Sequence, residues 1–136
     1  MSRSSEAFDA DVLKKAKATG KVVLTVKGTP YEMTGELKFD QKSFSAVQPR
    51  PGGKPLKLVF KWTNANVFAP GTTSLSAGQA HVTTVGVVGL GENVPVHSGT
   101  LQISEFVDNR RLKGVLRLNP GSGSDALEAD FDLTVV

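Results

Sequence analysis

The closing segment of the chain, residues 110–136, alternates apolar and polar side chains on both sides of a single turn. The apolar positions are Leu112, Gly114, Leu116 and Leu118 in the first run, and Leu127, Ala129, Phe131, Leu133 and Val135 in the second. Between the runs lies the turn-forming segment 119–125, which is rich in Gly, Ser and Pro. A strict period of two on either side of such a segment predicts two antiparallel strands, each with one buried face.

The polar faces of these two predicted strands carry opposite charges. The charged positions are Arg111, Lys113 and Arg117 in the first run, and Glu128, Asp130 and Asp132 in the second. Opposite charges that face each other across an antiparallel pair stabilise its register. We therefore assign these charges to folding and do not interpret the three carboxylates as a glycosidase pair, which needs two carboxyl groups across a cleft.

The rest of the chain predicts an all-β protein with one short helix. Residues 1–20 are expected to form an N-terminal α-helix, capped by Ser4 or Ser5 and ended by Gly20 as its C′ residue. Residues 21–136 are expected to form seven or eight mainly antiparallel strands, as a β-sandwich or a closed barrel. The length of 136 residues fits a single domain spanning residues 1–136.

Five local predictions concern the turns, loops and a hairpin of this sheet. Residues 28–30 are expected to turn the chain between two strands, and residues 48–55 form a Pro- and Gly-rich loop. Residues 63–78 are interpreted as an irregular segment, and such long loops are often functional. Residues 80–88 and 94–106 are expected to form a further hairpin, and Asp108 and Asn109 a tight turn.

Charge and composition limit the classes of function. The net charge is +3, but residues 1–61 carry twelve Lys/Arg and six Asp/Glu, so the basic charge is concentrated in this half. Lys38, Lys42, Lys57 and Lys61 are expected to share one face. Single-strand binders also need exposed aromatic residues for base stacking. Here the aromatic side chains fall at inward positions, so we do not expect nucleic acid as a partner. The positions in question are Tyr31, Phe39, Phe60 and Trp62.

No residue pattern indicates a catalytic, metal or cofactor site. There is no cysteine, and the two histidines, His81 and His97, are predicted to lie too far apart on their hairpin to share a metal ion. The glycine-rich segment 86–91 leads into a strand, whereas phosphate-binding loops open a helix. We expect no catalytic residue, metal or cofactor.

One resemblance concerns the closing half of the chain. Residues 98–106, 111–118 and 129–133 follow the pattern SGTLxIxxF, RLxGxxxL and FDL. This pattern resembles small bacterial β-sandwich proteins of uncharacterised function, which are often exported or lipid-anchored. The resemblance implies a β-sandwich fold and supplies no active residues.

The leading functional expectation is a non-enzymatic module that binds a protein partner, or assembles with itself, through loops and a sheet edge. The predicted contact residues are Arg50, Lys54, Asn64, Asn66, Thr72 and Thr73. The first alternative is a carrier that holds a small apolar ligand inside a barrel, and the second is a hydrolase with an unrecognised polar site.

The start of the chain and its hydropathy bear on location. No apolar run reaches the roughly 20 residues of a membrane helix, so no transmembrane segment is predicted. The first residues, Met-Ser-Arg-Ser-Ser-Glu, show no apolar leader region. The protein is therefore expected either in the cytoplasm or a virion, or outside the cytoplasm after a leader has been removed.

Overall fold

The structure, a computed structural model, describes residues 17–63, 66–87, 90, 92–108, 110–119 and 126–135. These residues form eleven β-strands and no helix, so the predicted all-β antiparallel class is confirmed, while the predicted count of seven or eight strands is too low. The strands are β1 (Lys17–Val26), β2 (Thr29–Met33), β3 (Glu36–Phe39), β4 (Ser43–Gln48), β5 (Leu56–Trp62), β6 (Gly71–Ser76), β7 (Ala80–Val85), β8 (Asn93–Val94), β9 (Ser98–Val107), β10 (Arg111–Asn119) and β11 (Leu127–Val135). In the described residues no helix is long or apolar enough to cross a bilayer.

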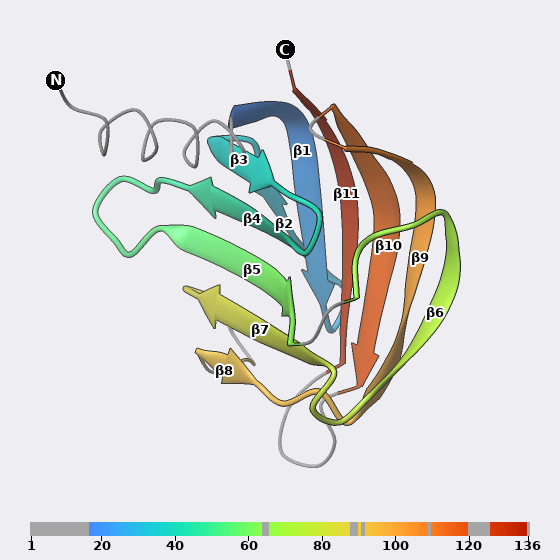
Figure 1. The fold of residues 1–136 in the computed structure, drawn as a ribbon. Helices are drawn as coiled ribbons and strands as arrows, with labels where there is room; N and C mark the ends of the chain where they lie inside the picture. The colour runs from blue at the N-terminus through green and yellow to red at the C-terminus, as the bar shows by residue number, and fades with distance from the viewer. Residues whose placement is uncertain are drawn as a thin grey trace, which may run out of the picture.

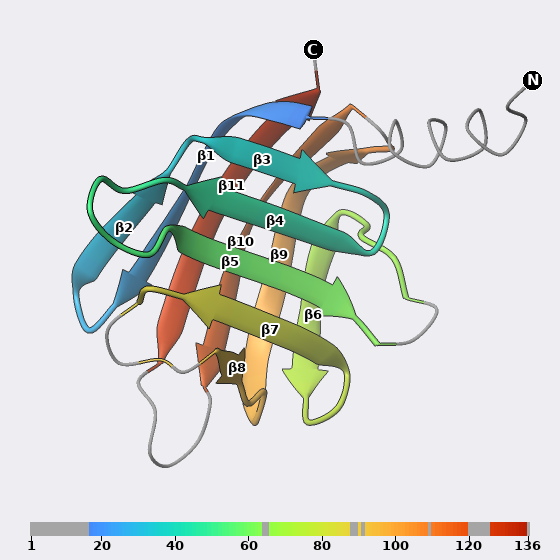
Figure 2. The same cartoon turned by 90° about the vertical axis from the view of Figure 1, so that its left-hand side faces the viewer.

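All eleven strands belong to one antiparallel sheet that curls over on itself (Figure 1). The strand order is β6-β9-β10-β11-β1-β3-β4-β5-β7-β8, with β2 paired to β1 off this path. Strands β6, β9, β10 and β11 form one layer, and β3, β4, β5 and β7 cross in front of it as the second layer (Figure 2). The described sheet is therefore a half-barrel, whose path ends at β6 and at β8.

The core lies between the two layers and contains the inward positions of the alternating strands. Phe39, Phe60 and Trp62 are buried and Tyr31 is half-buried, as their parity predicts. The ring of Phe44 on β4 lies 4.4 Å, between centroids, from that of Phe131 on β11. Phe44 thus joins the two layers directly.

Strand β1 connects the two layers, and its second pairing partner changes from β3 to β2 on either side of Gly20. Along one edge it pairs with β11 from Ala18 to Val26, and along the other it pairs with β3 at Ala18 and with β2 from Val22 onward. Gly20 has φ +123°, and a Cβ there would lie 1.9 Å from the carbonyl oxygen of Asp132. The predicted helix end at Gly20 is therefore wrong, because residues 17–20 are strand; the rest of the predicted helix, residues 1–16, lies outside the described residues.

The first turn is shifted from its predicted position. The chain reverses at Lys27 and Gly28, both with positive φ (52° and 78°), so Thr29 and Pro30 already belong to β2. A two-residue turn with positive φ at both positions matches the twist of the flanking strands. The turn was predicted at residues 28–30, and the left-handed conformation of a lysine gives no signal in the sequence.

The middle of the chain differs most from its prediction. Six of the sixteen residues in the predicted irregular segment 63–78 form β6, which pairs with β9. Of the predicted hairpin of 80–88 with 94–106, only the short pairing of β7 with β8 forms, with Val82 opposite Val94. The rest of the prediction is wrong, because β7 pairs along its other edge with β5, and β9 pairs with β6 and β10. Pro95 explains part of this difference, since it cannot donate to a ladder and it follows directly on the two-residue strand β8.

The closing hairpin forms as predicted, except that Asp130 lies opposite Val115 and Val23 and faces no basic residue directly. Strands β10 and β11 pair so that Arg117 lies opposite Glu128 and Lys113 lies opposite Asp132. A turn leads into it, in which the Arg110 backbone N–H donates to the carbonyl of Val107. Asn109, predicted in this turn, lies outside the described residues.

Candidate functional site

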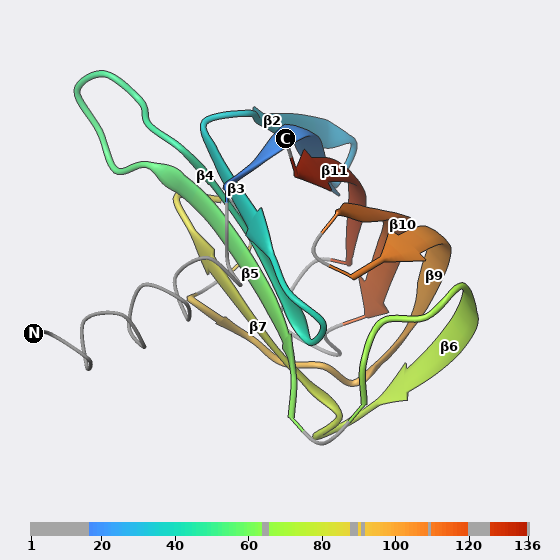
Figure 3. The same ribbon diagram turned by 45° about the horizontal axis from the view of Figure 1, so that its top comes forward.

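The predicted contact residues Thr72 and Thr73 lie in β6, at one end of the strand order (Figures 1 and 3). The register with β9 runs from Gly71 opposite Ile103 to Ser76 opposite Ser98. β6 pairs with no other described strand. Its other long side is therefore a sheet edge.

The hydrogen bonds of Ser76 show which backbone groups face that edge. Its N–H donates to the side-chain oxygen of Gln79 (2.9 Å), and its carbonyl accepts from the Gln79 N–H (3.2 Å), so both groups point away from β9. Backbone groups in an antiparallel strand alternate between its two sides. Thr72 and Ser74 therefore also direct their N–H and C=O groups to the outer edge. No hydrogen bond from another described residue reaches these backbone groups.

The composition of β6 leaves this edge unprotected. Natural sheets protect their edges with charged residues, proline, bulges or very short strands. β8 has two residues, and β2 contains Pro30 and Glu32. β6 is six residues of Gly, Thr, Ser and Leu, without charge or proline, and residues 71–74 are exposed.

The structure does not bring the other predicted contact residues to this edge. Arg50 and Lys54 lie in the loop between β4 and β5, on the opposite side of the molecule from β6 (Figures 1 and 3). There the Arg50 Nε–H donates to the Lys54 carbonyl (2.9 Å) and its Nη2 to the Gly86 carbonyl (3.4 Å). Asn66 is exposed in the segment that leads into β6, and Asn64 lies outside the described residues.

The contact residues predicted from the sequence did not include Ser74, whose backbone N–H and C=O groups face the outer edge. They did include Thr73, whose backbone groups face β9. The Thr- and Ser-rich composition of residues 71–76 is compatible with a strand. Its pairing partner, however, lies more than twenty residues further along the chain. Only that long-range pairing determines which backbone groups remain free.

The two histidines belong to different layers. His81 is exposed on β7, opposite Lys61 of β5. His97 is exposed just before β9, where its backbone N–H donates to the carbonyl of Asn119 (3.1 Å). In the part of the chain that the structure describes, no group of three or more His, Asp or Glu residues is placed to hold a metal ion.

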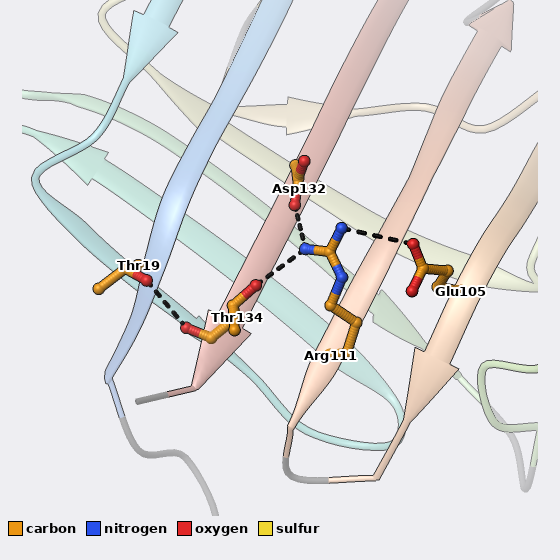
Figure 4. Close-up of polar contacts among 5 residues, drawn as sticks. All are labelled: Thr19, Glu105, Arg111, Asp132 and Thr134. Atoms are coloured by element: carbon orange, nitrogen blue, oxygen red, sulfur yellow. Dashed lines mark hydrogen bonds and ion pairs between the residues drawn. The ribbon is translucent and has the colours of Figure 1, made fainter.

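A polar cluster centred on Arg111 is the most connected set of charged side chains in the described strands (Figure 4). Arg111 of β10 donates to Asp132 and to the Thr134 hydroxyl (2.8 Å) of β11, and it lies 3.5 Å from the carboxylate of Glu105 on β9. The cluster holds three neighbouring strands together. It contains no histidine and no unpaired nucleophile, so it does not support the hydrolase alternative.

Electrostatics agree with a structural role for this cluster. The hydrogen bond to Asp132 raises the pKa of Arg111, partial burial lowers it, and Glu105 raises it again, with a net increase above its ordinary value. A base whose pKa is raised on folding contributes stability that is fully present below its unfolded pKa and is lost only as pH rises through the folded value. For an arginine that loss lies at strongly alkaline pH, so Arg111 gives no pH dependence near neutrality.

Replacement of Asp132 by lysine is expected to lower the free energy of unfolding by about 1–2 kcal/mol. The change removes the partner of Arg111 and places a cation opposite both Lys21 and Lys113. Urea unfolding measures the effect. Asp130→Lys is the matched control: Asp130 lies opposite Val23 and Val115, and we expect a loss below about 0.5 kcal/mol. Equal losses would contradict the assignment of Asp132 to cross-strand pairing.

The interior does not favour the ligand-carrier alternative. Besides its contact with Phe131, the Phe44 ring lies 5.7 Å from Phe60 and 6.4 Å from Phe68. Phe68, from the segment before β6, also approaches Phe106 of β9 (6.1 Å). These rings fill the space between the layers where they meet.

The chain matches no protein-family model, and it shows no significant similarity to a curated protein or to a solved structure. The resemblance to bacterial β-sandwich proteins stays a prediction. Function has to be argued from the geometry of the surface itself.

Proposed function

We propose that this protein is a non-enzymatic protein-binding module that takes up an extended segment of a partner on the outer edge of β6. The observation that carries the proposal is the pair of residues Thr72 and Ser74, whose backbone N–H and C=O groups face away from β9. An incoming strand satisfies such groups with main-chain hydrogen bonds. The partner's side chains would lie beside the hydroxyls of Thr72 and Ser74.

The surroundings of β6 support this use of the edge. Leu75 is buried and the Phe68 ring packs into the aromatic core, so β6 is fixed at both ends to the rigid part of the molecule. A preformed strand loses little conformational freedom on binding, which favours affinity. The free edge is therefore a fixed template.

Replacement of Ser74 by proline is the variant that tests the edge. The Ser74 N–H faces outward, so proline removes one outer donor and places its ring at the docking position while the ladder with β9 stays intact. We expect binding of an added strand to weaken at least tenfold, with the free energy of unfolding changed by less than about 1 kcal/mol.

The probe is a displayed library of random 12-residue peptides, panned on the wild-type chain, with affinities of the selected peptides measured by calorimetry. Thr73→Pro serves as the structural control, because the Thr73 N–H belongs to the ladder with β9 and its loss is expected to destabilise the chain by about 1–3 kcal/mol. Failure to enrich any peptide, or equal binding by wild type and Ser74→Pro, would contradict the proposal.

The strand added at the β6 edge can also come from a second copy of this chain, and Ser74→Pro tests this self-assembly as well. Light scattering after size-exclusion chromatography would then show a dimer for the wild type and a monomer for Ser74→Pro. A dimer that persists in the variant would place the assembly surface elsewhere.

A further inference from the structure

The outer face of β3, β4 and β5, toward the viewer in Figure 2, carries a hollow of about 620 Å³. Four lysines line it: Lys38, Lys42, Lys57 and Lys61. Their shared face was predicted from the alternation of the strands, and the structure confirms it. This basic hollow lies in the opposite layer from β6 and is independent of the proposed strand-binding edge.

The strand register places the lysines around a common floor. Lys57 and Lys61 are four residues apart on β5, about 13 Å along the strand. Lys38 of β3 lies opposite Ser45, which in turn lies opposite Val59 of β5. Lys42 is held at the Lys61 end, where its carbonyl accepts a hydrogen bond from the Trp62 N–H (2.9 Å). Ser45 and Val59 thus form the floor between the lysines.

These lysines differ from three basic residues on the other side of the molecule. Arg111, Arg117 and Lys21 each have a carboxylate partner, at distances that include 2.8 Å for Arg117 with Glu128 and 3.9 Å for Lys21 with Glu32. Among the described residues, no ion pair joins any of the four lysines of the hollow to a carboxylate. Their charges are therefore not used for pairing strands.

Two carboxylates also line the hollow, and among the described residues neither forms an ion pair with its lysines. The Asp40 carboxylate accepts hydrogen bonds from the backbone N–H groups of Lys42 (2.8 Å) and Ser43 (2.9 Å) and from the Ser43 hydroxyl (3.0 Å), so it closes the turn between β3 and β4. Glu36 lies at the other end, opposite Val47. The hollow keeps an excess of two positive charges over its lining residues.

We propose that this hollow binds a soluble anion that carries two or more phosphate groups, namely a short oligophosphate. Lysine ammonium groups act as point charges for phosphate, and like charges such as those of Lys57 and Lys61, about 13 Å apart along β5, repel each other until an anion lies between them. The volume falls within the range of small-ligand sites, roughly 300–1,000 Å³. The two lysines of β5 span about 13 Å, less than half of one turn of duplex DNA at about 34 Å, so the shape favours a compact anion over a nucleic acid.

The test is calorimetric titration of the full chain with inorganic tripolyphosphate at constant ionic strength. We expect saturable binding with one site, at least tenfold tighter than that of orthophosphate. The variant Lys57→Gln/Lys61→Gln should weaken the binding at least tenfold. The matched control, Lys21→Gln/Lys113→Gln, removes the same charge from the other layer and should change the affinity less than twofold.

Three results would overturn the proposal. Absence of saturable binding would show that the hollow holds no anion. Equal weakening of tripolyphosphate binding by both double variants would show that the affinity depends on the net charge of the chain and not on the lysines of the hollow. If phosphatidylserine vesicles or a DNA duplex bind more tightly than tripolyphosphate through the same lysines, the face binds an extended anionic surface instead of a compact anion.

Discussion

The free energy of unfolding is expected to fall by about 3–5 kcal/mol when Phe44 is replaced by alanine. The Phe44 side chain is 1% exposed, and its ring contacts Phe60, Phe68 and Phe131, which come from three other segments. Its removal opens a cavity where the two layers meet. Since domains of this size are stable by only about 5–15 kcal/mol, the variant should lose a large fraction of its stability.

Urea unfolding followed by tryptophan fluorescence measures this loss, because Trp62 lies on the same strand as Phe60, with the two rings 5.4 Å apart. Val107→Ala is the control: this side chain is 50% exposed on β9, and its truncation should change stability by less than about 0.5 kcal/mol. A loss below about 1.5 kcal/mol for Phe44→Ala would contradict a filled core at this point and would revive the ligand-carrier alternative.

The part of the fold that sequence reasoning predicted correctly is the part in which partner strands are adjacent along the chain. Strands β10 and β11 show alternation on both sides of one turn, and their opposite charges fix the register that places Arg117 opposite Glu128. Local alternation also gives the inward parity of Phe60 and Trp62. Both signals depend only on neighbouring residues.

The failures concern pairings between distant segments. Alternation in residues 71–76 and 80–85 shows which side chains share a face, but it contains no information on which strand lies beside them. β6 therefore went unrecognised in a polar segment, and the prediction for β7 missed its long partner, β5, and kept only the pairing with Val94. The same limit applies to the candidate site. Thr72 was identified from the sequence, whereas its free backbone groups follow only from the pairing of β6 with β9.

For the lysines of the hollow, one feature could be predicted from the sequence and another could not. Their common face follows from the alternation of three consecutive strands, so it was predictable. Their lack of carboxylate partners was not, because it depends on the turn in which Asp40 bonds to Lys42 and Ser43. An unpaired charge is a property of the folded arrangement.

A single methyl group at Gly20 is expected to lower the free energy of unfolding by more than about 3 kcal/mol. In Gly20→Ala the new Cβ would lie 1.9 Å from the carbonyl oxygen of Asp132, and φ of +123° is unfavourable for any side chain. Because the contact is with backbone, relief requires β1 to move away from β11, near the point where the other partner of β1 changes from β3 to β2. Thermal and urea unfolding measure the loss.

Alanine variants of two other glycines separate the cost of the positive φ from the cost of the close contact with Asp132. Gly28→Ala keeps the positive φ (78°) but meets no atom within 4 Å, so it should cost about 1–2 kcal/mol; Gly53→Ala has neither feature and should cost less than about 0.5 kcal/mol. The difference between Gly20→Ala and Gly28→Ala then measures the close approach of β1 to β11. If the two variants lose the same stability, the pairing of β1 with β11 does not depend on that contact. A loss larger by about 2 kcal/mol at Gly20 would show that the close pairing of β1 with β11, next to the strand that carries Phe131 against Phe44, depends on a residue without a side chain at this position.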